Sequence, residues 1–268
     1  MDARNNPRAL AELAEDVARR AGDLLSEGLH HSRIWVETKS TGTDMVSEMD
    51  HASEELITKA LLAARPDDGI VAEEGSAITG TSGIRWVVDP LDGTTNYLYG
   101  HPGWAVSIAA ESDGDVLAGV VFDPVHGELF TASRGDGARR NGSPIACSDQ
   151  CDLARTLVAT GFAYDATRRR AQAEVLVGLL PVVRDIRRMG SAAIDLCSVA
   201  CGRVDAYFER GLAWWDLAAG SIIAAEAGAV LTSLTGGPPQ PGSILAAAPG
   251  IAGPLGERLS ALGAGEVP

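Results

Sequence analysis

The strongest constraint on the fold is a series of five short apolar runs between residues 69 and 133. Glycine, aspartate and proline separate these runs, which is typical of β-strands joined by tight turns. One separator, SDGD at 112–115, contains the glycine that a two-residue hairpin loop requires, because glycine tolerates a positive φ. We therefore predict a largely antiparallel sheet from the runs GIVAEE, IRWVVD, WAVSIAAE, DVLAGVVFD and GELFTAS.

The residues before this sheet show the periodicity of helices. A first helix, with Asn6 as its cap, is predicted from apolar residues at the spacing of one helix face: Leu10, Leu13, Val17, Ala21 and Leu24. A second helix follows the polar stretch ETKSTGTDMVSEMD and ends near Ala64, because Pro66 cannot continue it. Helices packed on a sheet predict an α+β lobe, which we place at residues 1–145.

The pattern after residue 145 is different, because strand-like and helical segments alternate. The strand-like segments are TLVATGF, RDIRRM, VDAYFE, AVLTSL and SILAAAP, and the helical segments between them include SAAIDLCSVACG. Alternation of this kind is typical of an α/β unit. We predict a C-terminal α/β lobe over residues 146–268.

The composition argues against two classes of partner. The chain of 268 residues carries 36 acidic and 22 basic residues, and its formal net charge of −14 repels a nucleic-acid backbone. None of its apolar runs is long enough to cross a bilayer, and the N-terminal MDARNNPRALAELAEDVARR lacks the apolar core of a secretory signal. We expect a cytoplasmic protein without nucleic-acid or membrane partners.

The four cysteines fall into two pairs with three residues between the members of each, Cys147 with Cys151 and Cys197 with Cys201. This spacing places two sulfurs on one face of a helix, but a structural zinc site requires four converging ligands. The second pair lies in an apolar helical segment, where cysteine acts as a small apolar residue. We interpret the second pair as packing residues, and we expect neither pair to bind zinc or, in a cytoplasmic chain, to form disulfides.

The segment WVVDPLDGTTNY, residues 86–97, places Asp89 at the end of a predicted strand and Asp92 beyond a tight bend. Pro90 and Gly93 permit this bend, so that both carboxylates can face one point. Carboxylate oxygens are preferred ligands of Mg²⁺, although D-P-x-D-G is also an ordinary turn sequence.

Two further acidic positions bear on this choice. Glu73 and Glu74 end the run IVAEE, and adjacent like charges at a strand end are costly unless they are solvated or bound to a cation. Asp216 begins the helical stretch WDLAAGSIIAAEAG, where aspartate is also a favoured N-cap. From the residues alone, a metal site and ordinary turn and cap roles both stay open.

Three blocks, VAEE, WVVDPLDGTTNY and WWDLAAGSIIAAEAG, resemble in order and spacing the signature elements of the inositol monophosphatase family. The similarity extends from KSTGTDMVSEMD to EAGAVLTSLTGG, which is nearly the whole chain. It implies the layered αβαβα sandwich of that family, a Mg²⁺-dependent phosphomonoesterase activity, inhibition by lithium and a homodimer. The departures, such as AEEG where the family commonly has GEES, remove none of the metal ligands.

The resemblance implies two Mg²⁺ sites and a third, weaker one. The first would be held by Glu73, Asp89 and the carbonyl of Leu91, and the second by Asp89, Asp92 and Asp216. Glu73 and waters would contribute to the third. Such an arrangement is typical of multi-metal phosphoryl transfer, in which cations neutralise the phosphate and activate a water for in-line attack.

The resemblance also implies roles around the phosphate and the substrate. Thr94 would position the water with Asp50 as its hydrogen-bond partner, and Lys39 would belong to a mobile loop that closes over the metals. Together with Glu73, Thr94 and Asp50 would form the catalytic set. Substrate contacts would come from Asp92, Gly93, Thr94, Gly190, Ser191, Ala192 and Glu209. Without the resemblance, Asp50 would be an ordinary first-turn helix residue and Glu209 a strand-end residue paired with Arg210.

The leading hypothesis is hydrolysis of myo-inositol 1-phosphate or a close relative, because Glu209 supplies an acceptor that a polyol ring requires. The same catalytic frame also fits histidinol phosphate, fructose 1,6-bisphosphate or a 3′-phosphonucleotide. A non-catalytic, metal-binding regulatory protein is a different class of hypothesis, against which the intact acidic set argues. The arginine runs at 168–170 and in RDIRR are interpreted as solvated faces.

Overall fold

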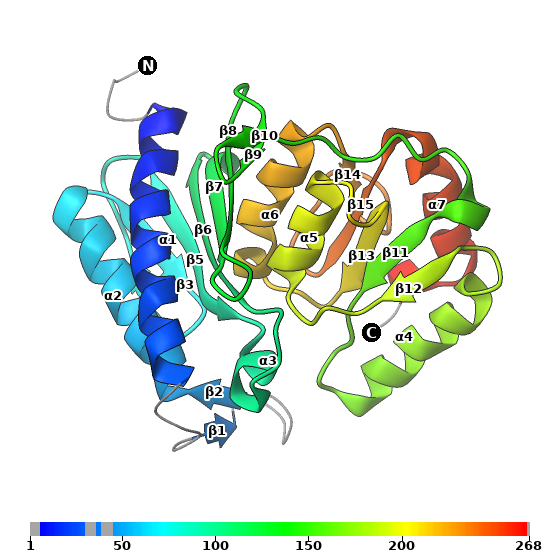
Figure 1. Ribbon diagram of the computed structural model, residues 1–268, viewed down its shortest axis with the longest axis horizontal. Coiled ribbons are helices and arrows are strands. Elements are labelled where there is room, and N and C mark those ends of the chain that lie inside the picture. Colours follow the sequence, from blue (N-terminus) through cyan, green and yellow to red (C-terminus); the bar gives the residue numbers. More distant parts are fainter. Residues whose placement is uncertain (1–5, 30–35, 39–44, 267–268) are drawn as a thin grey trace.

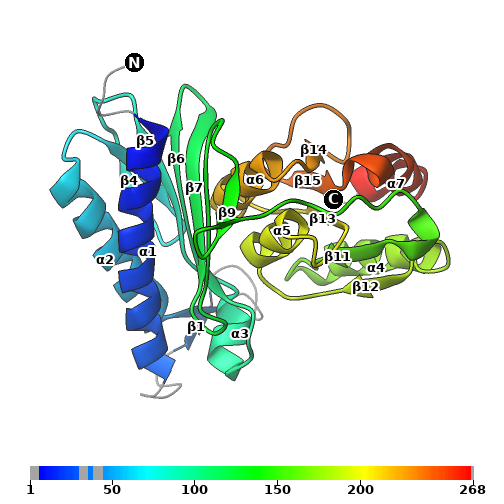
Figure 2. The same cartoon turned by 45° about the horizontal axis from the view of Figure 1, so that its top comes forward.

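The computed structural model describes residues 6–29, 36–38 and 45–266, which form five alternating layers of helices and sheets. Two helices cover an eight-stranded sheet, two more separate it from a five-stranded sheet, and a last pair covers the second sheet (Figure 1). In the order of the layers, these pairs are α1 (Pro7–Leu29) and α2 (Glu48–Ala64), α5 (Ala192–Ala200) and α6 (Trp214–Glu226), and α4 (Ala166–Leu179) and α7 (Pro249–Ala261). The αβαβα sandwich predicted from the sequence is confirmed, and Figure 2 shows its two sheets on either side of α5 and α6.

The start of α1 and the end of α2 lie where the sequence predicts. The Asn6 side chain accepts the backbone N–H of Arg8 at 3.0 Å, which satisfies a free donor of the first turn of α1. Leu25, rather than the predicted Leu24, is fully buried against the sheet. The second helix ends at Ala64, as the proline two residues later requires.

The first sheet has the strand order β10-β9-β8-β7-β6-β5-β3-β4. Its strands are β3 (Gly69–Ala72), β4 (Ala77–Ile78), β5 (Arg85–Asp92), β6 (Ala105–Ser112), β7 (Asp115–Asp123), β8 (Glu128–Ser133), β9 (Ala138–Arg140) and β10 (Ser143–Pro144). A separate two-stranded sheet pairs β1 (Val36–Thr38) with β2 (Met45–Ser47). The predicted hairpin between β6 and β7 is confirmed, since Asp113 and Gly114 both have a positive φ, 53° and 84°.

The sequence prediction of an antiparallel sheet holds from β5 to β10, but β3 and β5 pair in parallel. The short strand β4 causes this difference, because it carries the chain back along β3 before β5 begins. Parallel strands end at the same edge of a sheet. The residues that follow β3 therefore lie beside the C-terminal part of β5, which is decisive for the site described below.

The second sheet has the order β12-β11-β13-β15-β14. Its strands are β11 (Leu157–Thr160), β12 (Asp185–Arg187), β13 (Ala206–Arg210), β14 (Val230–Thr232) and β15 (Ser243–Ala247). The strand pairs β11–β12 and β11–β13 are parallel, as the predicted alternation of strands and helices requires. Strand β15 is antiparallel to both of its neighbours. The remaining short helix, α3 (Thr94–Tyr99), follows β5 directly.

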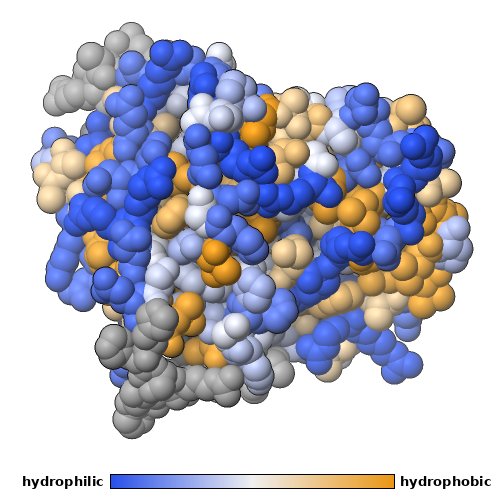
Figure 3. Space-filling model, viewed as in Figure 1, coloured by the Kyte–Doolittle hydropathy of each residue, from blue (hydrophilic) through white to orange (hydrophobic). Residues whose placement is uncertain are grey.

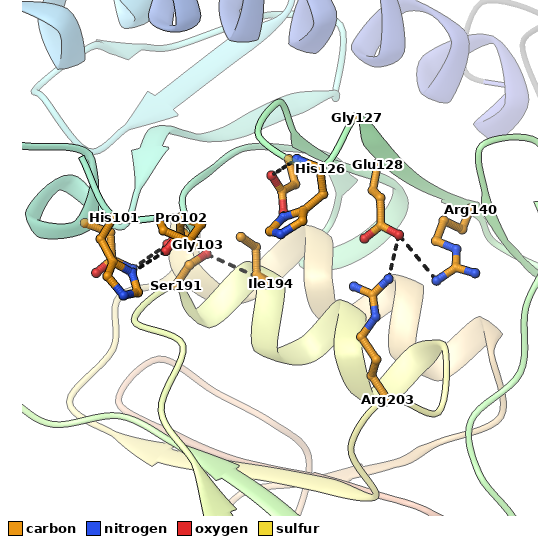
Figure 4. A network of polar contacts seen from close by, with 12 residues as sticks. His101, Pro102, Gly103, His126, Gly127, Glu128, Arg140, Ser191, Ile194 and Arg203 are labelled. Carbon is orange, nitrogen blue, oxygen red and sulfur yellow. Dashed lines mark hydrogen bonds and ion pairs between the residues drawn. The ribbon is translucent and has the colours of Figure 1, made fainter. Parts of the chain in front are cut away.

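The middle layer belongs to the C-terminal part of the sequence but packs on both sheets. Every residue of α5 is buried, including Cys197, and α6 approaches β7 so closely that a Cβ on Gly119 would lie 2.8 Å from the Ala219 carbonyl oxygen. Figure 4 shows both ends of α5. At its start, the Ser191 hydroxyl caps the helix by accepting the Ile194 N–H (3.2 Å), and beyond its end Arg203 reaches Glu128 of the first sheet. Residues of α5 and α6 belong to the hydrophobic clusters of both sheets. The predicted division at residue 145 stays a prediction.

The surface is mixed in character. Figure 3 shows hydrophilic residues over much of α1 and α2, and hydrophobic residues gathered at the opposite end of the molecule. Val177 of α4 and Leu180, which follows this helix, are exposed. None of the helices in the described part of the chain combines the length and the apolar character that a bilayer crossing needs.

Candidate active site

A cavity of about 460 Å³ opens where the ends of β5 and β13 meet the starts of α3, α5 and α6. Its walls include eleven residues predicted to contact metal, phosphate or substrate: Glu73, Asp89, Leu91, Asp92, Gly93, Thr94, Gly190, Ser191, Ala192, Glu209 and Asp216. Asp50 is buried behind this wall. Lys39, the predicted loop residue, lies outside the described residues.

Glu73 and Asp89 meet because β3 and β5 are parallel. Ala72 is the register partner of Val88, so the next residue of each strand reaches the same edge of the sheet. The Glu73 amide donates to the Val88 carbonyl at 3.2 Å, which continues this pairing by one residue. Burial, followed by the negative charge of Glu73, holds the pKa of the Asp89 carboxyl well above its ordinary value.

The bend predicted between Asp89 and Asp92 is present, and β5 loses its regular register with β6 there. The Leu91 amide donates to Asp89 Oδ1 at 3.0 Å and closes the bend. Ser53 of α2 donates its hydroxyl to the Pro90 carbonyl at 2.9 Å. The bend therefore presents both aspartates to the cavity while its own polar groups remain satisfied.

Asp92 connects the first sheet to the start of α5. Its Oδ2 accepts the Ser191 hydroxyl and the Ala193 amide, each at 2.7 Å. Burial raises the pKa of Asp92 to about 6, although both hydrogen bonds oppose the rise. The predicted backbone turn at 190–192 thus also holds a carboxylate from a strand far away in the sequence.

Asp216 is the third residue of α6 and accepts the Ala213 amide through Oδ2 at 2.6 Å. Ala213, not Asp216, is the N-cap, but the carboxylate still satisfies a free N–H at the helix start. Burial, followed by the charges of Asp92 and Glu73, raises the pKa of Asp216 well above its usual range. The capping role and a place in the acidic group are therefore compatible.

This acidic group suits a hard cation. Several carboxylates enclosed together resist joint ionisation unless a positive charge joins them. Asp89, Asp92 and Asp216 each commit one named oxygen to the protein, and the wall of the cavity supplies oxygen ligands rather than histidine or cysteine. Within residues 6–29, 36–38 and 45–266, no group of three histidine, cysteine, aspartate or glutamate side chains is arranged to hold a metal ion by itself. The Leu91 carbonyl, waters and substrate oxygens would have to complete the ligand sphere, as is usual for Mg²⁺.

Thr94 and Asp50 form a buried pair beside the acidic group. The Thr94 hydroxyl lies 3.1 Å from Asp50 Oδ1 and 3.2 Å from the Leu91 carbonyl oxygen. Asp50 is fully buried in the first turn of α2, where its carboxylate also suits the helix dipole. The structure brings together the two residues that the resemblance pairs and that the sequence separates by 44 positions.

The start of α3 depends on a glycine. Gly93 is its N-cap with φ 97°, and a Cβ there would lie 2.7 Å from the Gly103 carbonyl oxygen. Asn96 in the same helix donates to the carbonyls of Gly103 (2.7 Å) and Met189 (2.8 Å). These contacts fix the amides of the turn against the segment that leads into α5.

Glu209 lies on the far wall of the cavity, at the end of β13. It accepts the Tyr207 hydroxyl through Oε2 at 2.7 Å. A Cβ on Gly161 would lie 1.9 Å from the same oxygen, so glycine is required for this close approach. Burial raises the pKa of Glu209 to about 7, against the hydrogen bond from Tyr207.

Several residues of the site were missed by sequence reasoning. Arg168 and Arg188, which were interpreted as solvated, line the cavity together with Tyr164 and Trp215. Arg188 and Trp215 had a sequence signal, since they lie two residues before the predicted contact Gly190 and one residue before the predicted ligand Asp216. Tyr164 and Arg168, before and in the first turn of α4, reach the cavity through the fold of the chain, which a local pattern does not encode.

A further missed residue supports the site from behind. Glu54 of α2 is buried and accepts the amides of Glu74 (2.7 Å) and Ser76 (2.9 Å). These amides belong to the turn that follows Glu73. Together with Asp50, which pairs with Thr94, Glu54 makes one face of α2 the support for two separate loops of the cavity.

Comparison with known proteins gives one consistent result. The model of the inositol monophosphatase family matches residues 6–263 of the chain. A Mycobacterium leprae (strain TN) protein named inositol-1-monophosphatase is 47% identical over 231 residues, which are 82% of this chain and 79% of that protein.

Two further relatives bear on fold and role. A Pasteurella multocida (strain Pm70) protein named Nus factor SuhB is 43% identical over 246 residues, which are 90% of this chain and 92% of that protein. The structure of an inositol monophosphatase from Anabaena (Nostoc) sp. PCC 7120 superimposes with a TM-score of 0.86 at 36% identity and covers 98% of each chain.

Proposed function

Because the chain belongs to the inositol monophosphatase family, we propose that it is a Mg²⁺-dependent phosphomonoesterase that hydrolyses myo-inositol 1-phosphate or a closely related inositol phosphate. The observation that carries this proposal is the convergence of four carboxylates on one cavity beside the Thr94–Asp50 pair. A phosphate ester is repelled by such a cavity unless cations enter with it. The convergence of the four carboxylates is therefore explained by a phosphate substrate that binds together with cations.

The groups that would hold two to three Mg²⁺ ions are Glu73, Asp89, Asp92, Asp216 and the carbonyl of Leu91. Bound there, the cations would neutralise the phosphate, lower the pKa of a water molecule and stabilise the leaving alkoxide.

The remaining residues would position the reactants. Thr94 would orient the attacking water, because its hydroxyl is already held against the buried Asp50 carboxylate. The amides of Gly93 and Thr94 would donate to phosphate oxygens at the start of α3. Glu209 would accept a hydroxyl of the inositol ring, which the turn at 190–192 would contact through its backbone.

The direct test is phosphate release from a panel of substrates, each with and without Mg²⁺ and lithium. We expect release from myo-inositol 1-phosphate that requires Mg²⁺ and is inhibited by lithium through the second metal site. Histidinol phosphate, fructose 1,6-bisphosphate and a 3′-phosphonucleotide are the alternatives on the same frame. A preference for one of them would correct the substrate, and full activity in excess lithium would contradict the expected inhibition.

Glu209→Gln tests the substrate assignment. The neutral side chain is a weaker acceptor, so we expect kcat/KM for myo-inositol 1-phosphate to fall about tenfold or more, as for other hydrogen bonds to charged groups. Release from an aryl phosphate without ring hydroxyls should change little and serves as the control. Full activity of the variant on inositol phosphate would remove the main support for a cyclitol substrate.

A second candidate is a regulatory role, which the name Nus factor of a relative at 43% identity favours. No release from any sugar, inositol or nucleotide phosphate in excess Mg²⁺ would support it. The variant Asp89→Asn would separate the two roles, because it removes one of the carboxylates that catalysis needs without adding bulk to the fold.

Two expectations from the sequence remain predictions. We propose that the protein is a cytoplasmic homodimer. Light scattering of the purified chain measures its mass in solution, and fractionation of cells that express it measures its location.

A further inference from the structure

The wall of the cavity around Glu209 carries positive charge, in contrast to its acidic end. Arg168 and Arg188 line this part together with Tyr164 and Arg210. Arg168 belongs to the first turn of α4, and Arg188 follows β12 directly. Two elements that are separate in the sequence thus bring guanidinium groups to the same opening.

Two glycines show where these guanidinium groups lie. A Cβ on Gly211 would be 3.5 Å from Arg168 Nη1, and one on Gly190 would be 2.2 Å from Arg188 Nη1. Both glycines line the cavity. Although burial raises the pKa of Glu209, the charge of Arg188 opposes that rise, so the guanidinium is close enough to act on the Glu209 carboxylate.

Neither guanidinium group forms a hydrogen bond or an ion pair with any residue that the structure describes. Their sequence neighbours do: Arg187 binds Asp185 at 2.7 Å, and Arg170 lies 3.6 Å from Glu174. In a chain of net charge −14, carboxylates are abundant as partners. The side-chain donors of Arg168 and Arg188 therefore remain available to a ligand.

We infer that Arg168 and Arg188 form a subsite for a second anionic group, so that the protein acts on bisphosphates of cyclitols or sugars in preference to the corresponding monophosphates. Guanidinium groups match phosphate oxygens in geometry and charge. The scissile phosphate would lie at the acidic end with its cations, the ring hydroxyls at Glu209, and the second phosphate at the arginines. This inference rests on the proposed phosphatase function.

The chemistry at the scissile phosphate is unchanged by this subsite. Water supplies the new oxygen of the released phosphate and gives up a proton, the bond between phosphorus and the ester oxygen breaks, and the leaving alkoxide takes up a proton. The second phosphate ester stays intact on the product. Its contribution is binding, and it acts at a distance from the reacting atoms.

The test compares matched pairs of substrates under saturating Mg²⁺: fructose 1,6-bisphosphate with fructose 1-phosphate, and inositol 1,4-bisphosphate with inositol 1-phosphate. We expect the wild-type protein to favour the bisphosphate of at least one pair by about tenfold in kcat/KM. Arg168→Gln and Arg188→Gln should remove most of this preference by raising KM for the bisphosphate more than KM for the monophosphate. The pair that shows the effect tells whether the second phosphate comes from a sugar or a cyclitol.

Arg170→Gln and Arg187→Gln are the controls, because they remove the same charge one or two positions away from groups that are already paired. Equal kcat/KM for mono- and bisphosphates in the wild type would overturn the inference. So would equal losses in the controls, or losses that are the same for both substrates of a pair. Absence of phosphate release from all four substrates would instead contradict the proposed function on which the inference rests.

Discussion

At the scale of single residues, the carboxylates of the site are held in place by hydrogen bonds and opposed by their own burial. Asp92 accepts two hydrogen bonds from the start of α5, and Asp216 accepts one from its own helix. Both nevertheless have raised pKa values, because desolvation outweighs these bonds. The metal-free fold therefore prefers protonated carboxyls, whereas a bound cation prefers them charged.

The metal-free protein is expected to lose stability as the pH rises. The folded-state pKa values of Asp92 (about 6) and Glu209 (about 7) lie above their ordinary values, so the stability they contribute is complete at low pH and is lost as the pH rises through them. For Glu209, the rise from 4.5 to about 7 corresponds to about 3 kcal/mol. Urea unfolding in EDTA between about pH 5 and 8 measures the slope.

The matching control is Glu209→Gln, which cannot titrate and should show a smaller slope over the same range. Excess Mg²⁺ should flatten or reverse the slope of the wild-type protein, because the cation binds the charged carboxylates. A metal-free stability that rises steadily toward pH 8 would contradict the account of these groups.

Thr94→Ala should lower kcat about a hundredfold with little change in KM, because the hydroxyl is proposed to position the attacking water rather than to bind substrate. Thr94→Ser should restore most of the rate, since it keeps the hydroxyl beside Asp50. Thr95→Ala is the control, as its hydroxyl lies 3.5 Å from Tyr164 and away from the buried pair. Equal losses for both alanine variants would show that the helix, not the hydroxyl, had been damaged.

At the scale of elements, α2 acts as a frame for the loops of the site. Asp50, Ser53 and Glu54 are buried on one face of the helix and contact Thr94, the Pro90 carbonyl and the amides that follow Glu73. A rigid helix can hold several loops in fixed relation, which the loops cannot do for each other. The precision of the acidic group thus depends on an element that contributes no metal ligand.

Glu54→Ala should raise the Mg²⁺ concentration needed for half-maximal activity about tenfold, because it releases two amides of the turn that follows Glu73. The maximal rate in excess Mg²⁺ should be affected less. Glu55→Ala is the matched control, since Glu55 is exposed and pairs with Lys59 on the same helix. If both variants shifted the Mg²⁺ dependence equally, the turn would not depend on Glu54.

Most elements could be predicted from the sequence, because hydrophobic period and turn residues are local signals. The parallel pairing of β3 with β5 could not, because it depends on the two residues of β4 reversing the chain. Asp89 and Asp92 were candidates because they lie in one bend, whereas the resemblance to the family, not the local pattern, joined Glu73 and Asp216 to them. Arg168 and Arg188 were not candidates, since the position of a long side chain depends on contacts with segments distant in the sequence.

At the scale of the whole molecule, the first sheet is joined to the middle layer by polar contacts as well as by apolar packing. Glu128, at the start of β8, lies between Arg203, which follows α5, and Arg140 at the end of β9 (Figure 4). The separations are 2.5 Å to Arg203 and 3.4 Å to Arg140. Both arginines hold the pKa of Glu128 below its ordinary value, Arg203 through the largest effect.

Glu128→Ala should lower the free energy of unfolding by about 1–2 kcal/mol, as expected for the loss of charge-assisted hydrogen bonds that are partly shielded from water. Activity at a temperature well below unfolding should not change, because the contact lies away from the cavity. Asp115→Ala, which breaks the more exposed pair with Arg134, is the control and should cost less. Equal effects of both variants would show that Glu128 does not join the layers.

The hydrogen bond from Ser191 to Asp92 spans 99 positions of the chain, and it has a consequence for how the protein comes to be folded. Contacts between distant segments form late, because a long loop must close first. During synthesis, the first sheet and three of the acidic residues leave the ribosome well before the helices that complete the cavity. The nascent chain would then bind a divalent cation only after this late step, and the onset of cation binding would mark the completion of folding.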